Sequence, residues 1–350
     1  MMTYKNLPSG VSGEHLEVLN TPYIDSGFLS RLQANTQELL SKSDTEGIGF
    51  FNCRTANQCL HDAKSQQIPR KLYESLFFEN ELTILVADTG VGKSVFATQI
   101  ANEISVNEKV LYLDLELSDK QFQGRYSENY QNEFVFNENL YRVSFKRGFE
   151  MPKGVSYENY FIESLKNLVE KTEAKIVIID NMTRLITGDT DQAKSAKPLM
   201  DNLNDLKFDL NLSMLLLEHT KKVDTSRPIQ LNDLQGSKMK ANFADAVFTI
   251  GRSAKDKNLR YVKQLKVRSC EAEFDSENVI VYEIVKEKSF LGFRFVEYGS
   301  ETNHLQQPNE NDKEARICTV KELHSQGKTQ RQIATELGIS LGTVNKYLKK

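Results

Sequence analysis

The segment Ala87-Asp88-Thr89-Gly90-Val91-Gly92-Lys93-Ser94 constrains the fold of this chain more than any other, because it joins an apolar run to an amphipathic stretch. Gly90 and Gly92 allow the backbone to wrap closely around phosphate oxygens, and amide groups at the start of a helix attract anions. Lys93 is placed to reach the β- and γ-phosphates of a nucleotide, and the Ser94 hydroxyl is placed to hold Mg²⁺. Ala87 occupies the position of the usual first glycine, and its small side chain is tolerated at a strand end. The segment predicts a strand, a phosphate-binding loop and a helix, in that order.

Short, continuous apolar runs recur after this segment and define the fold class. Runs of this kind are too short for buried helices and are typical of parallel strands covered on both faces. The segment Ser94–Val106 between the first two is amphipathic and predicts a helix. We therefore expect an α/β domain with a doubly wound, mainly parallel sheet. Later runs follow one another with little helix between them, which predicts antiparallel strands at one edge. The first group is Leu82–Val86, Val110–Leu113, Ile176–Ile179 and Met214–Leu217, and the later group is Ala246–Ile250, Tyr261–Val267, Val279–Val285 and Phe293–Val296.

Charge is unevenly distributed along the 350 residues, which carry a net charge of −3. Residues 313–350 hold eight Lys and Arg against three Glu, a net charge of +5, which leaves −8 on residues 1–312. Contact with nucleic acid is therefore expected at the C-terminus or in local loops rather than over the whole surface. The predicted organisation is an N-terminal segment of unassigned role (1–75), a nucleotide-binding domain (76–298), a flexible polar linker (299–312) and a small helical domain (313–350).

No apolar stretch approaches the roughly 18 residues that span a bilayer, and the N-terminus has no signal-peptide pattern. The four cysteines are scattered without metal-binding spacing, which is typical of reduced, partly buried thiols in a cytoplasmic protein.

Acidic residues at strand ends complete the predicted nucleotide site. Asp180 ends the run Ile176–Ile179, where a carboxylate can bind Mg²⁺ through water. A general base for hydrolysis is expected just past the strand that begins at Val110, where Asp114 and Glu116 both occur. Alternation along a strand directs these two side chains the same way, so the pattern alone leaves the choice open.

The stretch Tyr112-Leu113-Asp114-Leu115-Glu116-Leu117-Ser118, with Gln121, Phe122 and Arg125 after it, resembles replicative helicases of the DnaB type. Those enzymes are RecA-like P-loop ATPases. The resemblance implies a RecA-like fold, ATP and Mg²⁺ as ligands, and Glu116 as the general base.

The resemblance covers roughly residues 70–270 and continues at Leu215-Leu216-Leu217-Glu218-His219-Thr220-Lys221. It implies that His219 senses the γ-phosphate and relays its state to DNA-binding loops. Helicases more often carry glutamine there, and histidine is closer to the plasmid RepA-type ATPases. The segments Asp233–Ser237 and Ala244–Val247 resemble the same group.

The stretch Gln264-Leu265-Lys266-Val267-Arg268 resembles the Lys-x-Arg element that ring ATPases project into a neighbouring subunit's ATP. Two cations two positions apart on a strand share one face. The resemblance implies that Lys266 and Arg268 complete the site across a subunit interface, and hence a homo-oligomer, with a hexameric ring as the expected form. A solvated edge strand is the alternative interpretation.

Two polar segments follow the strands that bear Asp180 and His219. They are Thr187–Pro198 and Lys221–Lys240, and they include Lys194, Lys197, Lys221, Lys222, Arg227, Lys238 and Lys240. In RecA-like rings the equivalent loops grip single-stranded DNA in a central channel, and basic side chains suit that contact. Ordinary solvated loops are the alternative.

Residues 314–350 have the pattern of a helix–turn–helix domain. Ala315–Gln326 predicts a first helix, a capping box of Thr329 and Gln332 begins the second, and Gly338-Ile339-Ser340 forms the turn. Leu341, Val344 and Leu348 are expected to anchor the third helix. The run from Lys328 to Leu348 resembles resolvase- and regulator-type helix–turn–helix domains, which implies duplex DNA binding. The predicted contact residues are Arg331, Thr343, Asn345 and Lys346. A helical trimer that binds another protein is the alternative.

Three functions fit these patterns. The first is a RepA/DnaB-like ring ATPase acting on DNA in the replication or mobilisation of a plasmid, phage or integrated element. The second is an ATP-switched DNA-binding regulator that does not translocate. The third is a RecA- or KaiC-like ATPase in recombination or protein regulation.

Overall fold

The computed structural model describes residues 47–48, 51–185, 193–221, 223–235, 238–306 and 310–349. The chain divides into two compact units between Ile68 and Pro69. In the first unit, the strands β1 (Gly47–Ile48) and β2 (Phe51–Asn52) pair, and an exposed helix α2 (Ala56–Ala63) begins after its N-cap Thr55. A short amphipathic helix within 28–40, which the apolar pattern allows, falls outside the described residues.

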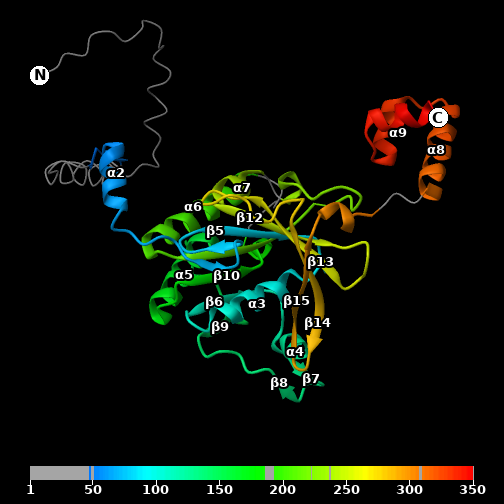
Figure 1. Ribbon diagram of the computed structural model, residues 1–350. Helices are drawn as coiled ribbons and strands as arrows, with labels where there is room; N and C mark the ends of the chain where they lie inside the picture. The colour runs from blue at the N-terminus through cyan, green and yellow to red at the C-terminus, as the bar shows by residue number, and fades with distance from the viewer. Residues whose placement is uncertain are drawn as a thin grey trace, which may run out of the picture. The chain divides into compact units, whose positions relative to one another are not determined.

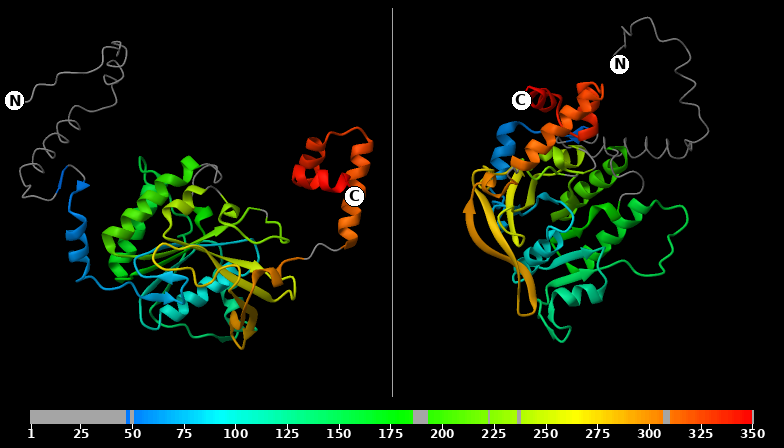
Figure 2. Two further views of the ribbon diagram at one scale, coloured as in Figure 1. Left: turned by 45° about the horizontal axis from the view of Figure 1, so that its top comes forward. Right: turned by 90° about the vertical axis from the view of Figure 1, so that its right-hand side faces the viewer.

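The second unit is built on a mixed sheet of nine strands (Figures 1 and 2). Six strands from β12 to β9 are parallel, and β13, β14 and β15 extend one edge in antiparallel register. This arrangement confirms the predicted mainly parallel sheet with antiparallel strands at one edge. In spatial order the strands are β15 (Phe290–Gly299), β14 (Val279–Glu287), β13 (Leu259–Lys266), β12 (Ala246–Arg252), β5 (Leu82–Ala87), β11 (Ser213–His219), β10 (Ile176–Asp180), β6 (Val110–Asp114) and β9 (Leu140–Val143).

Helices cover both faces of this sheet, as Figure 1 shows. One face packs against α5 (Tyr157–Thr172), α6 (Ala193–Leu210) and α7 (Lys238–Phe243), and the other packs against α3 (Lys93–Ile104). Each face of the sheet therefore has its own hydrophobic core. Because side chains alternate along β5, Ile84 packs into the core beneath α5, α6 and α7, whereas Leu85 packs into the core beneath α3. The carboxyl ends of the parallel strands thus meet at one edge of the sheet, where ligands bind in such folds.

Smaller elements complete the second unit. They are β3 (Lys71–Tyr73), β4 (Phe77–Phe78), β7 (Ser127–Glu128), β8 (Asn132–Glu133), α4 (Asp119–Arg125) and the 3₁₀ helices η3 (Met182–Arg184), η4 (Leu231–Asp233) and η5 (Glu301–His304). Because β3 packs against α3, residues from Pro69 onward belong to this unit rather than to the N-terminal segment that the sequence predicts to end at residue 75.

The linker predicted as flexible over residues 299–312 is in part folded. Glu301 and His304 of η5 are buried, because Glu301 pairs with Lys263 and the ring of His304 contacts the Ser253 hydroxyl at 2.8 Å. All four cysteines are exposed, so the prediction of partly buried thiols is wrong. Within the described ranges, no helix is long and apolar enough to cross a membrane.

The C-terminal helices are α8 (Glu310–Ser325), α9 (Gln330–Leu337) and α10 (Leu341–Leu348). Val320, Ile333 and Val344 form their common core. The predicted capping box is confirmed, since Thr329 and Gln332 bond reciprocally at the start of α9. Leu341, however, is 45% exposed and lies outside this core, so it does not anchor α10 as predicted.

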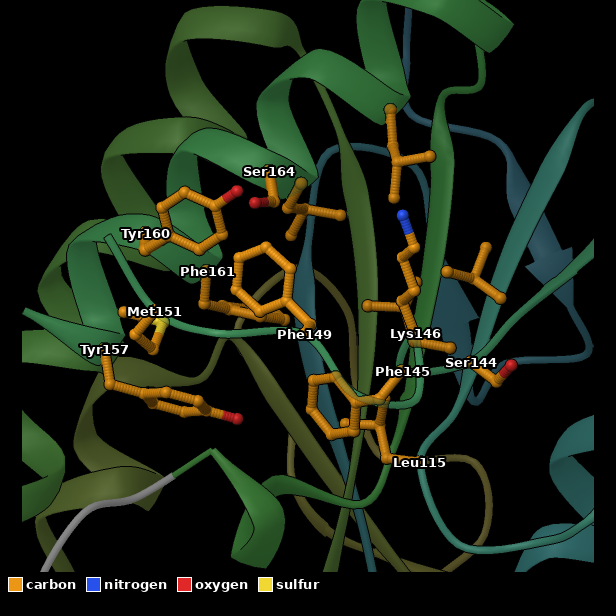
Figure 3. Close-up of a pocket in the computed structure, with 14 residues that line it drawn as sticks. Leu115, Ser144, Phe145, Lys146, Phe149, Met151, Tyr157, Tyr160, Phe161 and Ser164 are labelled. Carbon is orange, nitrogen blue, oxygen red and sulfur yellow. The ribbon is translucent and has the colours of Figure 1, made fainter. Parts of the chain in front are cut away.

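A long irregular segment, residues 144–156, connects β9 to α5. Together with α5 and the ends of β6 and β9 it surrounds a cavity of about 340 Å³ (Figure 3). Connections of this length without regular structure are uncommon in compact domains and are usually functional.

Candidate active site

The phosphate-binding loop has a backbone that requires glycine. Gly90 and Gly92 have φ angles of 71° and 103°, a region that favours glycine. A Cβ atom at Gly92 would also lie 2.8 Å from Ile284 Cδ1 and 2.9 Å from Phe293 Cζ, both on the antiparallel hairpin. The loop therefore ends in a tight turn from which α3 begins, with its first amide groups at the carboxyl edge of the sheet.

Lys93 lies at the centre of the site and is only 6% exposed. Its Nζ donates to the Ala87 carbonyl at 3.2 Å and lies 3.0 Å from Nδ1 of His219. Burial lowers the pKa of Lys93 to about 8, although the nearby carboxylates, Asp180 foremost, oppose the shift. Burial, followed by the neighbouring Lys93 charge, also lowers the pKa of His219, which is therefore neutral at pH 7.

Asp180 lies at the end of β10 and is almost completely buried. The Tyr112 hydroxyl donates to Oδ2 of Asp180 at 2.8 Å, whereas Oδ1 is buried without a hydrogen-bond partner among the described residues. Burial raises the pKa of Asp180 to about 6, and the hydroxyls of Ser94 and Tyr112 oppose that shift. A cation beside Oδ1 would remove the cost of this buried charge.

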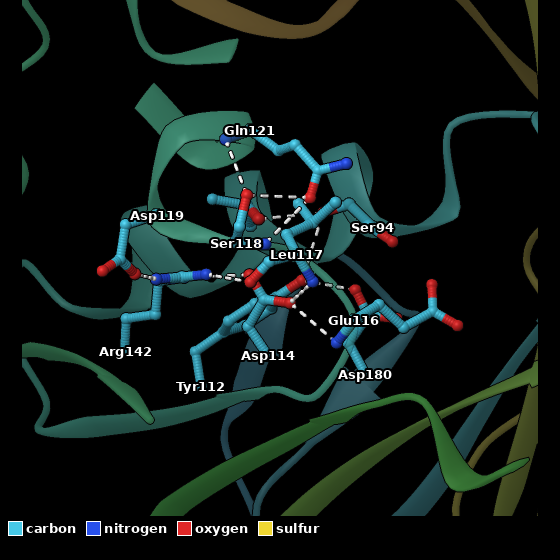
Figure 4. A network of polar contacts seen from close by, with 11 residues as sticks. Ser94, Tyr112, Asp114, Glu116, Leu117, Ser118, Asp119, Gln121, Arg142 and Asp180 are labelled. Atoms are coloured by element: carbon cyan, nitrogen blue, oxygen red, sulfur yellow. Dashed lines mark hydrogen bonds and ion pairs between the residues drawn. The ribbon is translucent and has the colours of Figure 1, made fainter. Parts of the chain in front are cut away.

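The structure distinguishes Asp114 from Glu116, which the sequence pattern left open (Figure 4). Oδ1 of Asp114 accepts the backbone amides of Glu116 and Leu117 at 3.3 and 2.9 Å, and Oδ2 accepts Nε of Arg142 at 2.9 Å. Asp114 is thus buried and fully engaged in holding the loop that follows β6. The side chain of Glu116 lies beyond the strand and is exposed.

Asn181 is a member of this site that the sequence did not reveal. Its amide donates to a carboxylate oxygen of Glu116, and the same nitrogen lies 3.3 Å from Nε2 of His219. Neutral imidazole offers one acceptor, yet Asn181 and Lys93 both approach the ring with N–H donors. His219 can accept from only one of them at a time. The only sequence signal was the position of Asn181 directly after Asp180.

Two arginines near the loop were also missed. Nη2 of Arg252 donates to the Thr89 carbonyl at 2.9 Å, and Nε of the buried Arg260 donates to the Val91 carbonyl at 2.8 Å. They lie at the end of β12 and the start of β13, which bring them beside the phosphate-binding loop from more than 160 positions away in the chain. Their role here is to fix the loop backbone.

Lys266 and Arg268 lie at the opposite end of the sheet from this loop. Lys266 is in register with Val247 near the start of β12, whereas Ile250 of the same strand is in register with Ala87. Nζ of Lys266 donates to one carbonyl within α7 and to one just after its end, and Arg268 contacts Asp245 at 3.2 Å. Neither cation can therefore reach the nucleotide site of its own subunit.

The two predicted DNA-binding segments are only partly loops. Within Thr187–Pro198, residues 193–198 form the start of α6, and residues 187–192 lie outside the described part. In the second segment, Lys240 is buried and pairs with Glu218 at 2.6 Å, and Arg227 pairs with Asp233 at 2.6 Å. Lys240 is consequently not available to DNA, contrary to the prediction.

On the C-terminal domain, Arg331, Asn345 and Lys346 are exposed. Asn345, Lys346 and Lys349 line a shallow depression on α10. Thr343 is half-buried, and its backbone amide and hydroxyl both contact the Ser340 hydroxyl at the start of the helix. Ser340 is therefore the N-cap of α10, and Thr343 is held by this cap in the first turn of the helix.

Two family models match the chain. Residues 53–225 match the model described as AAA domain, and residues 325–350 match the one described as winged helix-turn-helix DNA-binding. Together with the sheet topology and the phosphate-binding loop, these matches define the class of the two domains: the chain carries a P-loop AAA domain of RecA-like fold and a C-terminal helix–turn–helix domain.

Two solved structures illustrate the similarity. One is a DnaB-like replicative helicase, determined with its interactions with primase, at 16% identity and a TM-score of 0.50; the match covers 75% of this chain and 71% of that one. The other is the KaiC-like protein PH0186 from Pyrococcus horikoshii OT3, at 16% identity and a TM-score of 0.44, covering 63% and 91%. A comparison with curated proteins found no match.

Proposed function

We propose that the protein hydrolyses ATP and couples this reaction to movement on DNA or remodelling of DNA. The observation that carries the proposal is the convergence of Lys93, Asp180 and Glu116 at one edge of the sheet, with His219 and Asn181 between them. The resemblance to RepA- and DnaB-type enzymes supports a role in the replication or mobilisation of a plasmid, phage or integrated element.

The residues present fit ATP and Mg²⁺. The amide groups at the start of α3 and the Lys93 ammonium provide a cradle for phosphates. The buried, unpartnered Oδ1 of Asp180 and the Ser94 hydroxyl provide oxygen ligands, directly or through water. Within the described ranges, no cluster of three or more acidic, His or Cys side chains could hold a metal by itself, as expected for a magnesium ion whose remaining ligands are phosphates and water. When bound, Mg²⁺ would neutralise charge on the β- and γ-phosphates.

Glu116 is placed to accept a proton from the attacking water. It is exposed, it is not consumed by the structural contacts that occupy Asp114, and its one described side-chain partner is Asn181. A carboxylate in this state can orient water and take its proton, whereas a saturated carboxylate cannot.

His219 and Asn181 connect the phosphate site to the basic segment after β11. A bound γ-phosphate would accept hydrogen bonds from the Lys93 ammonium and so break its contact with His219. The acceptor nitrogen of His219 would then be available to another donor. Because Asn181 also holds Glu116, a change at His219 can alter the position of the base. The adjacent Glu218 pairs with Lys240, so a displacement of His219 is transmitted to α7, which follows this basic segment in the chain.

We further propose that the active form is a ring, with six subunits as the expected number. Lys266 and Arg268 lie at the end of the sheet remote from their own nucleotide, and Arg268 is more than half exposed. A neighbouring subunit that packs its phosphate site against this end would receive both cations, which suits stabilisation of the charge on a transferring phosphoryl group.

The test is ATP hydrolysis by the full chain with and without single-stranded DNA, combined with a mass measurement in the presence of ATP. We expect DNA to stimulate hydrolysis, ATP to favour an oligomer, and Lys93→Ala to abolish turnover. Arg268→Ala should reduce turnover of the assembled protein but leave nucleotide binding intact. If Arg268→Ala hydrolyses ATP at the wild-type rate in the oligomer, the proposal of a shared site is wrong.

The second candidate is an ATP-switched DNA-binding regulator. The observation that favours it is that His219 contacts Lys93 and Asn181 holds Glu116, in a chain that also carries a domain of duplex-binding type. Slow hydrolysis that single-stranded DNA does not change, with ATP-dependent binding to a duplex site, would support the regulator over the translocating enzyme.

A further inference from the structure

The segment between β9 and α5 has a composition that its structural role does not explain. It contains Phe145-Lys146-Arg147-Gly148-Phe149, in which two aromatic rings enclose two cations. The side chains of Phe145 and Phe149 are 48% and 46% exposed. Aromatic side chains of this size are normally buried, and a group of them at the surface marks a binding site.

The aromatic rings open onto the cavity of about 340 Å³. Figure 3 shows Phe149 between Phe145 of the segment and Tyr160 of α5. Phe149 and Tyr160 stack with ring centres 5.3 Å apart and planes 21° from parallel. Tyr157 and Phe161 from α5 add further rings, and Ser144 and Ser164 supply hydroxyl groups at the edge. The cavity is thus a flat-sided aromatic site with few polar groups, at the small end of the usual range of about 300–1,000 Å³ for ligand pockets.

The segment that borders this cavity carries a net positive charge. Residues 144–156 include Lys146, Arg147 and Lys153 against one acid, Glu150. None of the three cations makes a hydrogen bond or ion pair with another residue of the described structure. Their charges are therefore available to an anionic partner.

We propose that this segment, with the cavity behind it, binds single-stranded nucleic acid by stacking an unpaired base on Phe145 and Phe149. Lys146, Arg147 and Lys153 contact the flanking phosphates. Stacking platforms flanked by cations are how proteins hold single strands without reading sequence, since every base has an aromatic face. The inference rests on the proposal that DNA is the substrate and adds a site separate from the segments after β10 and β11.

The cavity also lies next to the loop after β6 that carries Glu116, the proposed general base. Leu113 and Leu115 form part of its wall, and Leu115 is adjacent in the chain to Glu116. A base that enters the cavity therefore packs against the backbone that positions the proposed general base. Occupation of this site is a direct route by which a single strand can stimulate hydrolysis.

The test uses the full-length double variant Phe145→Leu/Phe149→Leu, which keeps the apolar character and removes both aromatic faces. Binding to fluorescent oligo(dT) is measured by anisotropy, and an unchanged melting temperature confirms folding. We expect binding about tenfold weaker than wild type for the loss of one stacked base. The matched control is Phe208→Leu, since Phe208 is also an exposed aromatic residue but lies on α6, outside this segment.

Two further measurements separate base stacking from other contacts. An abasic oligonucleotide should bind the wild type and the double variant equally, because it has no base to stack. Lys146→Gln/Arg147→Gln should lower the slope of log affinity against log salt by about 1.4, at roughly 0.7 for each phosphate of a single strand that the variant no longer neutralises. A thymine oligomer carrying 5-iododeoxyuridine should crosslink to residues 144–160.

If the double variant binds oligo(dT) as tightly as the wild type, the proposed stacking site is wrong. The proposed function would still stand in that case, because the wild-type protein binds single-stranded DNA. If the double variant instead alters the oligomeric mass at constant DNA affinity, the aromatic surface is an interface between copies of the chain and the inference is wrong. If the wild type binds no single-stranded DNA at all, the proposed function fails together with it.

Discussion

The buried ammonium of Lys93 makes nucleotide affinity depend on pH in a direction that the structure fixes. Its pKa falls from 10.5 in water to about 8 in the nucleotide-free protein because burial disfavours the charged form. A shift of that size corresponds to about 3 kcal/mol of lost preference for the protonated state. Bound phosphates would reverse the shift, since they place negative charge beside the ammonium.

ATP binding should therefore take up a proton when the solution pH exceeds about 8. Below that pH Lys93 is already charged and affinity is at its full value. At pH 9 about one tenth of the free protein carries the charge, so the dissociation constant should rise about tenfold for each further pH unit. Affinity thus begins to fall near the pKa of Lys93 in the free protein, and it continues to fall until the pH reaches the higher pKa of Lys93 in the ATP complex.

The assay is titration with a fluorescent ATP analogue and Mg²⁺ between pH 7.5 and 9.5. The Glu116→Gln variant prevents turnover during the measurement, and circular dichroism checks that the fold is constant over the range. Lys93→Arg is the control, because a guanidinium stays charged throughout and any residual binding should be independent of pH. A dissociation constant that stays constant from pH 7.5 to 9.5 would mean that the charge of Lys93 does not control nucleotide affinity.

Three further predictions concern neighbouring contacts. Gly92→Ala should abolish nucleotide binding, because its Cβ has no room beside the hairpin, whereas Gly148→Ala, with a positive φ but nothing within 4 Å, should bind normally in the same titration. Asn181→Ala should raise hydrolysis in the absence of DNA, since it releases Glu116; an unchanged ratio of stimulated to basal rates would contradict this. Lys240→Met leaves the buried Glu218 unpaired and should lower the free energy of unfolding in urea by about 3–5 kcal/mol; a decrease below about 1 kcal/mol would mean that the pair contributes little.

The central strands were predictable because each is a continuous apolar run buried on both faces. β5, β6, β10 and β11 begin and end within two residues of the predicted limits. The edge strand β9 was not predicted. It pairs with β6 on one side only, and its four residues are at most partly buried and include the charged Arg142. Apolar periodicity reports burial and is weak where a strand is half exposed.

The choice between Asp114 and Glu116 depended on contacts that no local pattern contains. The expected alternation along the strand placed both carboxylates on one face. Instead β6 ends at Asp114, whose carboxylate turns back to bind two amides of the following loop and Arg142, 28 residues further along the chain. A long-range partner thus decided which acid is buried in structural contacts and which is exposed at the site.

The burial of charged residues was also harder to predict than that of apolar residues, because it depends on partners far away in the sequence. Lys240 and Glu301 were predicted in solvated segments, yet each is buried with a partner of opposite charge from another element. A buried charge is tolerated only with such a partner, and the sequence alone does not reveal which distant residue supplies it.

The most direct test of the central claim is the rate of ATP hydrolysis by the full chain with and without single-stranded DNA, measured in parallel for Glu116→Gln. We expect DNA to stimulate the wild-type rate, and Glu116→Gln to bind ATP but hydrolyse it at least about a hundredfold more slowly. A rate that no DNA alters, or a Glu116→Gln variant that turns over at the wild-type rate, would contradict the central claim.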